Sequence, residues 1–422
     1  MNILWISNIL FPEAQALLSG NGALKASGGW MIGSADRLIQ QEGIKLTVAS
    51  LSSLVNEITF LKGKSIDYYI IPYGKGNKRV NHSYEPLWKE VKEKVKPDVV
   101  HIHGTEYTHG LAYIEACGTE NVCISIQGLV SAYYYYYYYG LTSLQIIKSF
   151  TPASIINGGI WSGLRDFIRR SECEKEVIKR VNHIIGRTSW DRDRTWAINP
   201  EATYHYCGET LREEFYSTER WSYNKCTPHS IFISQAWMPL KGLHQVLRAM
   251  PLVLRHFPDT TIRVAGADVT RGKGWLNSLK TSDYGNIIGK LIKKNGLYNR
   301  VVFTGNLDAK AMRDEYLRSN VFICPSAIEN SPNSLGEAQV LGVPVLASYA
   351  GGIPDMMKGD EEHLYRFEEI EMLAHKIVKI FEQEGTIDTT LMRSNALKRH
   401  DPAQNVLDLV GIYEAIGKSS IN

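Results

Sequence analysis

The chain has little of several features that would assign it to a special class of protein. In 422 residues it has six cysteines and a formal net charge of +3. The cysteines show no metal-ligand spacing, and scattered thiols suit a reducing cytosol. The small charge argues against nucleic acid as a partner. No apolar run reaches about 18 residues, which disfavours a membrane-spanning helix. The N-terminus lacks a basic segment, so Asn2–Ser7 is interpreted as a first strand rather than a signal peptide.

The sequence contains two successive series of β-branched runs that alternate with helical patterns, which predicts an α/β protein with parallel sheets. The second series starts near Ser230, and its segment 243–254 repeats apolar residues at helical spacing. We therefore expect two doubly wound, Rossmann-like domains, 1–220 and 221–404, with ligands at the carboxyl ends of their strands. The strands expected in the first series are Asn2–Ser7, Lys45–Ser50, Tyr68–Ile71, Asp98–His103, Val122–Ile126 and His183–Gly186.

The segment 324–354 combines the parts that a nucleotide-diphosphate site needs. Two carboxylates, Glu329 and Glu337, lie eight positions apart around an expected helix start. Ser331 is the expected N-cap, with Pro332 at the first helical position. The next backbone N–H groups then lack intrahelical partners, and with the helix dipole they attract phosphate. These N–H groups belong to Asn333, Ser334 and Leu335.

At these residues the chain resembles the family 4 ("group 1") retaining glycosyltransferases of GT-B fold. The family signature reads here Glu329-x₇-Glu337, then Gly342-Val343-Pro344-Val345-Leu346-Ala347, then Gly351-Gly352. The resemblance implies two facing Rossmann-like domains with a ligand cleft between them and a nucleotide-diphospho-sugar donor. It also implies that a last helix, about 405–422, packs back on the first domain. Segments 186–193 and 211–216 are similar to a bacterial polysaccharide-type subgroup.

The resemblance also assigns roles on the donor side. Glu337 is expected to hold the ribose hydroxyls, and Glu329 to contact the transferred sugar or to order its loop. Lys241 is expected to reach the diphosphate, where a preorganised cation is worth about 3 kcal/mol. Gly28 and Gly29 would let backbone approach the donor phosphate or the acceptor. One departure is Ala236, which stands where the family usually has an arginine.

On the acceptor side the resemblance points to the ends of two early strands. His103 ends one strand, and both a structural role and an acceptor contact are open for it. Gln127 stands where many members have a histidine, and a glutamine positions a hydroxyl but cannot take a proton. This fits the mechanism usually proposed for the family, in which the leaving phosphate accepts the acceptor's proton.

The string Asp191-Arg192-Asp193 is the pattern that most resembles a metal-binding motif, since the pair His101 and His103 has no evident third ligand. The string lies on an expected helix, where residues i and i+2 face different ways, so a structural role is favoured. We expect no metal site and no cofactor besides the donor.

Seven consecutive tyrosines, Tyr133–Tyr139, precede a segment rich in arginine and lysine that extends to Arg180. Aromatic and basic residues together favour an anionic membrane surface. The alternative, a surface helix with partly buried tyrosines, is equally open.

The predicted function is transfer of a hexose-type sugar from a nucleotide-diphospho-sugar to a glycan or lipid-linked acceptor, with retention, in cell-surface polysaccharide biosynthesis. The expected location is the cytoplasm or the inner face of the membrane. Two alternatives remain: a catalytically silent sugar-binding or scaffold partner, and a nucleotide-sugar epimerase on the same fold.

Overall fold

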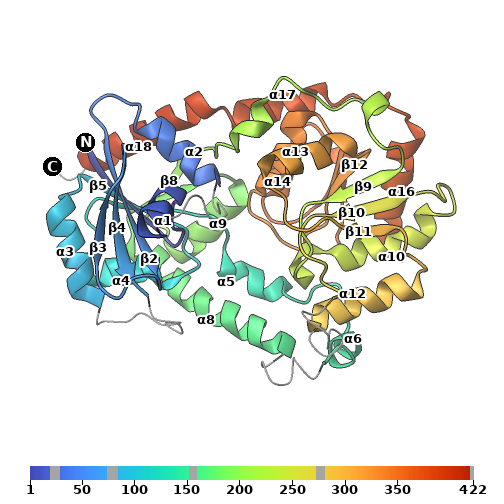
Figure 1. Cartoon of the computed structure of the whole chain (residues 1–422), viewed down its shortest axis with the longest axis horizontal. Helices are drawn as coiled ribbons and strands as arrows, with labels where there is room; N and C mark the ends of the chain where they lie inside the picture. The colour runs from blue at the N-terminus through green and yellow to red at the C-terminus, as the bar shows by residue number, and fades with distance from the viewer. Residues whose placement is uncertain (20–28, 74–83, 152–158, 272–280, 419–422) are drawn as a thin grey trace. The chain divides into compact units, whose positions relative to one another are not determined.

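The computed structural model describes residues 1–19, 29–73, 84–151, 159–271 and 281–418 (Figure 1). The chain divides into two compact units. Unit 1 comprises Met1–Ser131, Ile168–Arg212 and Arg399–Asn422, and unit 2 comprises Ala132–Phe167 and Glu213–Lys398. Each unit is built on one sheet with its own apolar core.

Unit 1 contains an eight-stranded sheet with the strand order β3-β4-β2-β1-β5-β6-β7-β8. Its neighbouring strands are parallel except β3, which runs antiparallel to β4 at the edge. The central strands are buried on both faces, as their runs of Val and Ile require. The strands are β1 (Asn2–Ser7), β2 (Lys45–Ser52), β3 (Thr59–Lys62), β4 (Asp67–Pro72), β5 (Val99–His103), β6 (Val122–Ser125), β7 (His183–Gly186) and β8 (Thr203–Tyr206).

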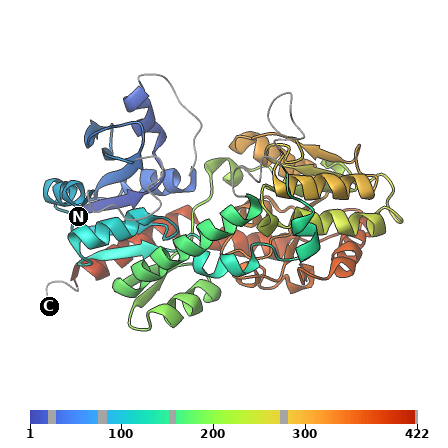
Figure 2. The ribbon, with the colours of Figure 1, turned by 90° about the horizontal axis from the view of Figure 1, so that it is seen from below.

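Helices cover this sheet, and the last of them comes from the far end of the chain. In both views α18 (Pro402–Lys418), drawn in red, lies beside early elements of unit 1 (Figures 1 and 2). The indole N–H of Trp5 on β1 donates to the Tyr413 hydroxyl at 2.9 Å. The other helices that begin in unit 1 are α1 (Pro12–Ser19), α2 (Gly29–Leu38), α3 (Glu85–Val95), α4 (Thr108–Cys117), α5 (Val130–Tyr133) and α9 (Ser189–Ile198).

Unit 2 contains a six-stranded parallel sheet with the order β11-β10-β9-β12-β13-β14. The strands are β9 (Ser230–Ile233), β10 (Thr261–Val264), β11 (Val301–Phe303), β12 (Val321–Cys324), β13 (Val345–Ser348) and β14 (Leu364–Tyr365). The α-helices that begin in unit 2 are α6 (Ser143–Ile147), α8 (Gly159–Arg180), α10 (Leu243–Val253), α12 (Asp283–Lys294), α13 (Ala309–Arg318), α14 (Asn333–Leu341), α15 (Ile353–Met356), α16 (Ile370–Glu382) and α17 (Thr390–Arg399).

The prediction of two α/β units with parallel sheets is confirmed, and the first and seventh strands have the predicted bounds. The apolar face predicted for segment 243–254 is buried as α10. Three strands were not predicted: β3, β8 and β14, which have two to four residues each. The units differ from the predicted domains because Ala132–Phe167 belongs to unit 2.

The placement of segment 132–167 follows from its contacts. His244 Nε2 contacts the Tyr139 carbonyl at 3.2 Å, and Arg248 donates to the Gly140 carbonyl at 2.6 Å. The Tyr139 ring packs on Phe367 at 5.3 Å between centroids. The segment lies between β6 and β7 of unit 1 in the sequence, but these long-range contacts make it part of unit 2.

Candidate functional site

Three loops of unit 2 meet because they follow neighbouring parallel strands. β9, β12 and β13 are adjacent in the sheet, so the loops at their carboxyl ends share one edge. The first loop carries Lys241 at the end of a short 3₁₀ helix, Pro239–Lys241. The second is segment 325–332, and the third holds Gly351-Gly352. The Ala327 N–H donates to the Leu240 carbonyl at 2.8 Å, which joins the first two loops.

Lys241 and Glu329 form a largely buried ion pair. The Lys241 ammonium lies 2.5 Å from Glu329 Oε1, with side-chain exposures of 17% and 10%. The same oxygen accepts from the Ser326 hydroxyl at 2.8 Å. The Ser326 carbonyl in turn accepts from Ser348 Oγ. The carboxylate is therefore held by a cation and a hydroxyl, and the cation is aimed at the loop before α14.

Two glycines let backbone segments approach closely here. Gly242 has φ +72°, and a Cβ on it would lie 1.7 Å from the Pro325 carbonyl oxygen. Gly351 has φ +57°, and a Cβ there would lie 1.9 Å from the Glu329 carbonyl oxygen. That carbonyl accepts from the Gly352 N–H at 3.0 Å. Because L side chains rarely adopt this φ, only glycine fits both positions without rearrangement.

The start of α14 corrects two details of the prediction. The N-cap is Pro332 and not Ser331, whose hydroxyl instead contacts the Met356 sulfur at 3.7 Å. The Leu335 N–H is not free, because it donates to the Pro332 carbonyl at 3.0 Å in a tight first turn. Asn333 and Ser334 are the first two helical residues, whose N–H groups precede any intrahelical bond.

Asn333 supplies a second polar group at this helix start. Its Oδ1 is buried and receives no hydrogen bond from the residues that the structure describes. An enclosed acceptor without a donor costs about 1–3 kcal/mol, which a ligand hydroxyl or N–H would recover. Glu337 lies one turn further along and is also buried, 3.4 Å from the Tyr316 hydroxyl.

Ala236, which stands where the resemblance implies an arginine, is buried. Next to it, Trp237 is 61% exposed and its indole N–H donates to Gln235 Oε1 at 3.3 Å. In this loop Lys241 is thus the cation that the structure brings to the helix start.

In unit 1, His101 and His103 on β5 are buried in an aromatic cluster. The His101 ring contacts the Tyr413 hydroxyl at 2.5 Å and Ser125 Oγ, so its role is structural. The His103 ring packs on Trp5 at 4.3 Å and on His101 at 3.9 Å between centroids. Burial lowers the pKa of His101 to about 3 and that of His103 well below its usual value, so both rings are neutral.

Gln127 follows β6 at the same edge of the sheet. Its Nε2 is buried and finds no acceptor within the described part of the chain. The loop that carries it is fixed by Glu174 of α8 (Gly159–Arg180), which accepts from the N–H groups of Val130 at 3.0 Å and Ser131 at 2.8 Å. Glu174 also accepts from the Thr105 hydroxyl at 3.1 Å. It was missed, because one glutamate in a charged helix gives no signal in the sequence.

Gly28 lies outside the described residues, and Gly29 is the first residue of α2. The sequence prediction that the pair approaches a ligand therefore stays a prediction.

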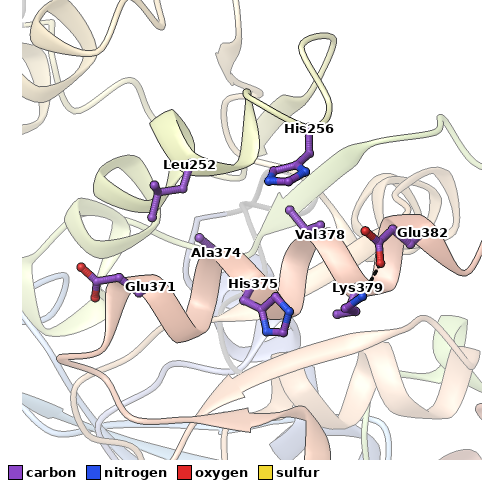
Figure 3. Close-up of a pocket in the computed structure, with 8 residues that line it drawn as sticks. All are labelled: Leu252, His256, Glu371, Ala374, His375, Val378, Lys379 and Glu382. Atoms are coloured by element: carbon purple, nitrogen blue, oxygen red, sulfur yellow. Dashed lines mark hydrogen bonds and ion pairs between the residues drawn. The ribbon is translucent and has the colours of Figure 1, made fainter.

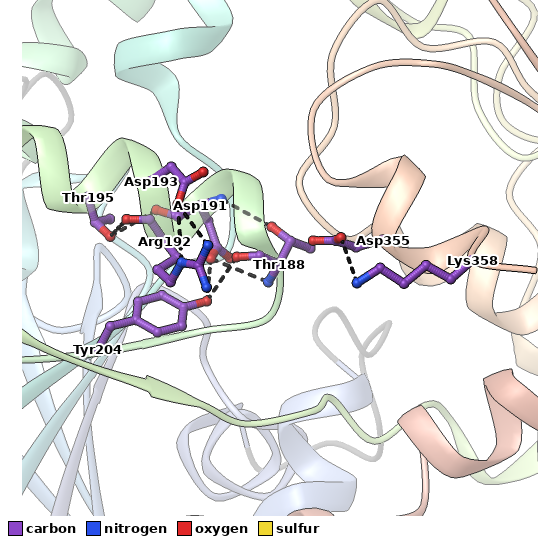
Figure 4. A network of polar contacts seen from close by, with 8 residues as sticks. All are labelled: Thr188, Asp191, Arg192, Asp193, Thr195, Tyr204, Asp355 and Lys358. Carbon is purple, nitrogen blue, oxygen red and sulfur yellow. Dashed lines mark hydrogen bonds and ion pairs between the residues drawn. The ribbon is translucent and has the colours of Figure 1, made fainter. Parts of the chain in front are cut away.

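Asp191 lies in the first turn of α9 within a polar network on unit 1 (Figure 4). Its side chain and that of Thr188 form a capping box at the start of α9, and Asp191 Oδ1 accepts from the Tyr204 hydroxyl at 2.5 Å. Asp193 is exposed and pairs with Arg192 at 3.1 Å. One carboxylate is buried in the capping box at the helix start, and the other is exposed in an ion pair, which agrees with the structural interpretation. The Asp355–Lys358 ion pair in the same figure belongs to unit 2.

Asp360, Glu362 and His363 have ligand atoms within 4.8 Å of one another, but His363 already contacts Asp360 at 2.7 Å. A hollow of about 350 Å³ lies on unit 2 between α10 and α16 (Figure 3). It contains none of the predicted site residues and is lined by Leu252, His256, Glu371, Ala374, His375, Val378, Lys379 and Glu382.

The tyrosine run is partly buried and partly exposed. Tyr137 is buried beside Phe167, and Tyr138 packs on Trp161 at 5.4 Å between centroids. Tyr135, by contrast, is 66% exposed. Among the described residues, no helix has the length and apolar character needed to cross a membrane.

Comparison with known proteins supports the reading of unit 2. Residues 227–383 match the family model "Glycosyl transferases group 1". This segment contains Lys241 and all of the site residues predicted around α14, so these residues lie within the part of the chain that the family model matches.

Two curated relatives match shorter segments. A GDP-mannose-dependent alpha-(1-6)-phosphatidylinositol monomannoside mannosyltransferase of Mycolicibacterium smegmatis is 28% identical over 125 residues, which cover 28% of this chain and 29% of that protein. Sulfoquinovosyl transferase SQD2 of Arabidopsis thaliana is 41% identical over 61 residues, 14% of this chain and 12% of that protein. The matches thus span less than a third of these relatives.

Solved structures resemble the whole fold. Sucrose-phosphate synthase from Thermosynechococcus elongatus superposes with a TM-score of 0.70 at 16% identity, covering 99% of both chains. Anabaena HepE in complex with UDP superposes with a TM-score of 0.64 at 14% identity, covering 98% of this chain and 100% of that one. At these identities the likeness concerns the fold alone, and it assigns the chain the two-domain architecture of those proteins.

Proposed function

We propose that this protein is a glycosyltransferase that moves a hexose-type sugar from a nucleotide-diphospho-sugar to a glycan or lipid-linked acceptor, with retention of configuration. The observation that carries the proposal is the buried Lys241–Glu329 pair at the start of α14, inside the segment that matches the family model. HepE, of similar fold, has been solved with UDP and with UDP-glucose, which supports a donor of this class.

The donor diphosphate would lie against the N-terminus of α14. The free N–H groups of Asn333 and Ser334 and the helix dipole favour an anion there, and Lys241 adds a full positive charge. The unpartnered Asn333 Oδ1 would accept from a donor hydroxyl. Glu337 would hold the ribose hydroxyls.

Glu329 would have two roles, as the ion-pair partner of Lys241 and as a contact of the transferred sugar. In the present structure it neutralises that cation, so donor binding would replace a carboxylate by a diphosphate as the partner of the ammonium. Glu329 would then contact the transferred sugar while the Gly351-Gly352 turn holds its backbone. Charge on the leaving diphosphate would be stabilised by Lys241 and the helix N-terminus, so these parts require neither a metal nor another cofactor.

On unit 1 the acceptor would contact Gln127. The buried amide Nε2 of this residue is a hydrogen-bond donor without a partner in the described part of the chain. His103 is neutral and buried, so it would shape this surface. Neither residue is a suitable general base, and the leaving phosphate would take the acceptor's proton. This favours retention, in which both events occur on one face of the sugar.

The exposed part of the tyrosine run and the basic helix α8 would present a lipid-linked acceptor from an anionic membrane surface, as in cell-surface polysaccharide biosynthesis at the inner face of the membrane. Arg170 is partly buried and lies 5.0 Å above the Tyr107 ring, so replacing it would also disturb packing. The exposed Arg165 is therefore the better site for a charge reversal. Sedimentation with anionic vesicles should fall for Arg165→Glu. Wild-type protein that never sediments with them would remove the membrane step.

The first experiment is calorimetric titration with UDP, GDP, ADP and their sugar conjugates. One nucleotide should bind the wild type, and Glu337→Ala should weaken it about a hundredfold, since truncating a buried hydrogen-bonded carboxylate costs roughly 2–3 kcal/mol. Glu368→Ala, at an exposed glutamate of unit 2, is the matched control and should bind normally. Folded protein that binds none of these compounds would refute the donor site.

Turnover separates the enzyme from a silent binding partner. The buried Ala236 leaves one cation fewer than the family pattern, which is the observation that favours a silent partner. Release of nucleotide with an acceptor glycan supports the transferase. Donor binding without transfer to any acceptor of a glycan library would assign the protein to the silent class.

A further inference from the structure

A second hollow, on the outer edge of unit 1, has the composition of a saccharide site. It has a volume of about 320 Å³ and lies between α9 and the edge strand β8. This volume is at the lower end of what small-ligand sites offer. Its lining includes Arg192, Asp193, Trp196, Asn199 and Tyr204. None of these residues belongs to the donor or acceptor sites described above.

Trp196 is the main reason to expect a ligand here. It is 65% exposed, although an indole of this size usually buries most of its surface. The C–H faces of a sugar ring stack on such a flat apolar surface, and its hydroxyls need polar partners at the rim. Arg192 and Asp193 provide a donor and an acceptor on the same helix, and both are more than half exposed.

The walls of the hollow are held rigidly before any ligand arrives. The Tyr204 hydroxyl donates to Asp191 Oδ1 and lies 3.2 Å from the Thr188 carbonyl, which fixes its ring against the start of α9 (Figure 4). Asn199 ties the end of α9 to the preceding helix by donating to the Ile178 and Val181 carbonyls at 2.8 and 2.9 Å. A preorganised surface loses little entropy when a ligand binds.

We propose that this hollow, centred on Trp196, binds a neutral oligosaccharide and so holds a glycan chain outside the reaction site. The charges at its rim, Arg192 and Asp193, cancel, which favours an uncharged chain over a polyanion. The inference rests on the proposed function for its biological meaning, but the binding itself is independent of the donor site in unit 2.

The test is calorimetric titration of the full chain with maltohexaose, cellohexaose and β-1,4-linked mannohexaose. At least one should bind, and Trp196→Ala should lower its affinity about tenfold, the usual effect of removing an aromatic anchor. Trp196→Phe should keep part of the affinity. Tyr298→Ala, at an aromatic residue of unit 2 that is also 65% exposed, is the matched control and should bind like the wild type.

Two results would overturn the inference: none of the three hexasaccharides binds, or Trp196→Ala binds them as well as the wild type. Nucleotide titration of Trp196→Ala distinguishes the two proposals, because donor binding by unit 2 should be unchanged. A normal thermal unfolding curve for the variant confirms that it is folded. If the wild-type protein binds no nucleotide or nucleotide sugar, the proposed function is refuted, but saccharide binding can still be measured.

Discussion

The two candidate sites both lie at the carboxyl ends of parallel strands, yet they are built from different chemistry. The site in unit 2 combines a buried ion pair with glycines at positive φ and a helix N-terminus. The site in unit 1 combines the neutral amide of Gln127 with imidazole rings that burial keeps uncharged, because the pKa of His101 falls to about 3 and that of His103 falls well below its usual value. This difference supports the proposal that a charged donor would bind to unit 2 and a neutral acceptor to unit 1.

The largest expected effect tests the close packing of unit 2. Gly242→Ala forces a Cβ against the Pro325 carbonyl oxygen at a φ of +72°, whereas Gly305→Ala has a φ of +77° and open space. The first substitution should lower the free energy of unfolding by about 3–5 kcal/mol and the second by about 1–2 kcal/mol, because only the first adds a collision to the backbone strain. Urea unfolding measures both. Equal losses would mean that close approach at Gly242 is unimportant.

The second effect concerns the ion pair that distinguishes unit 2. In a double-mutant cycle of Lys241→Met and Glu329→Gln, each single substitution should lower the free energy of unfolding by about 3 kcal/mol, because it leaves a buried charge unpaired. The double variant should lose only about half of the sum of the two single losses. Lys310→Met, at an exposed lysine of the same unit, should cost less than about 0.5 kcal/mol. Additive losses would show that the pair is not coupled.

The third effect belongs to unit 1 and depends on pH. Burial raises the pKa of Glu174 to about 7 from its usual 4.5. Between these two values the folded state binds more protons than the unfolded state, so this residue contributes a stability that falls as pH rises, by roughly 3 kcal/mol in all. The buried histidines act in the opposite direction, because their lowered pKa makes stability fall as pH decreases.

The difference between wild type and Glu174→Gln isolates the carboxyl from the histidines. Urea unfolding at several pH values should show this difference shifting in favour of the variant from pH 4.5 to 7. Glu172→Gln, at an exposed glutamate of the same helix, should give no such trend. A constant offset for Glu174→Gln would contradict the raised pKa.

The smallest effect separates the two carboxylates of the D-x-D string. Asp191→Ala should cost about 2 kcal/mol, because it removes the carboxylate that accepts from the Arg187 and Thr188 N–H groups and from the Tyr204 hydroxyl. Asp193→Ala should change stability by less than about 0.5 kcal/mol, as expected of an exposed ion pair. Thermal unfolding with and without a divalent ion completes the test, since stabilisation by the ion in wild type alone would support a metal site.

Much of the fold was predictable because strong local patterns and tertiary structure agree. Buried parallel strands such as β1 and β12 contain continuous apolar runs, and α10 has a regular apolar stripe. Short edge strands such as β3 and β8 carry polar and aromatic residues on partly exposed faces, so they lack that signal.

The candidate site was predictable in its composition but less so in its details. Glu329 and Lys241 are 88 positions apart, and only the sheet order brings them to 2.5 Å. The N-cap prediction failed by one residue because Pro332 keeps an extended ψ of 116°, which leaves the helix to begin at Asn333. The roles assigned to these residues, and to His103 and Gln127, stay predictions until ligands are measured.

The interleaving of the two units along the chain has a consequence for how the protein is made. Segment 132–167 leaves the ribosome long before α10, whose His244 and Arg248 it must meet. At common rates of synthesis the tyrosine run waits roughly ten seconds for its partners. β1 waits longer still, because Trp5 finds the Tyr413 hydroxyl only after 408 further positions. Neither unit can be completed until chain segments on both sides of the other unit's segments have been synthesised.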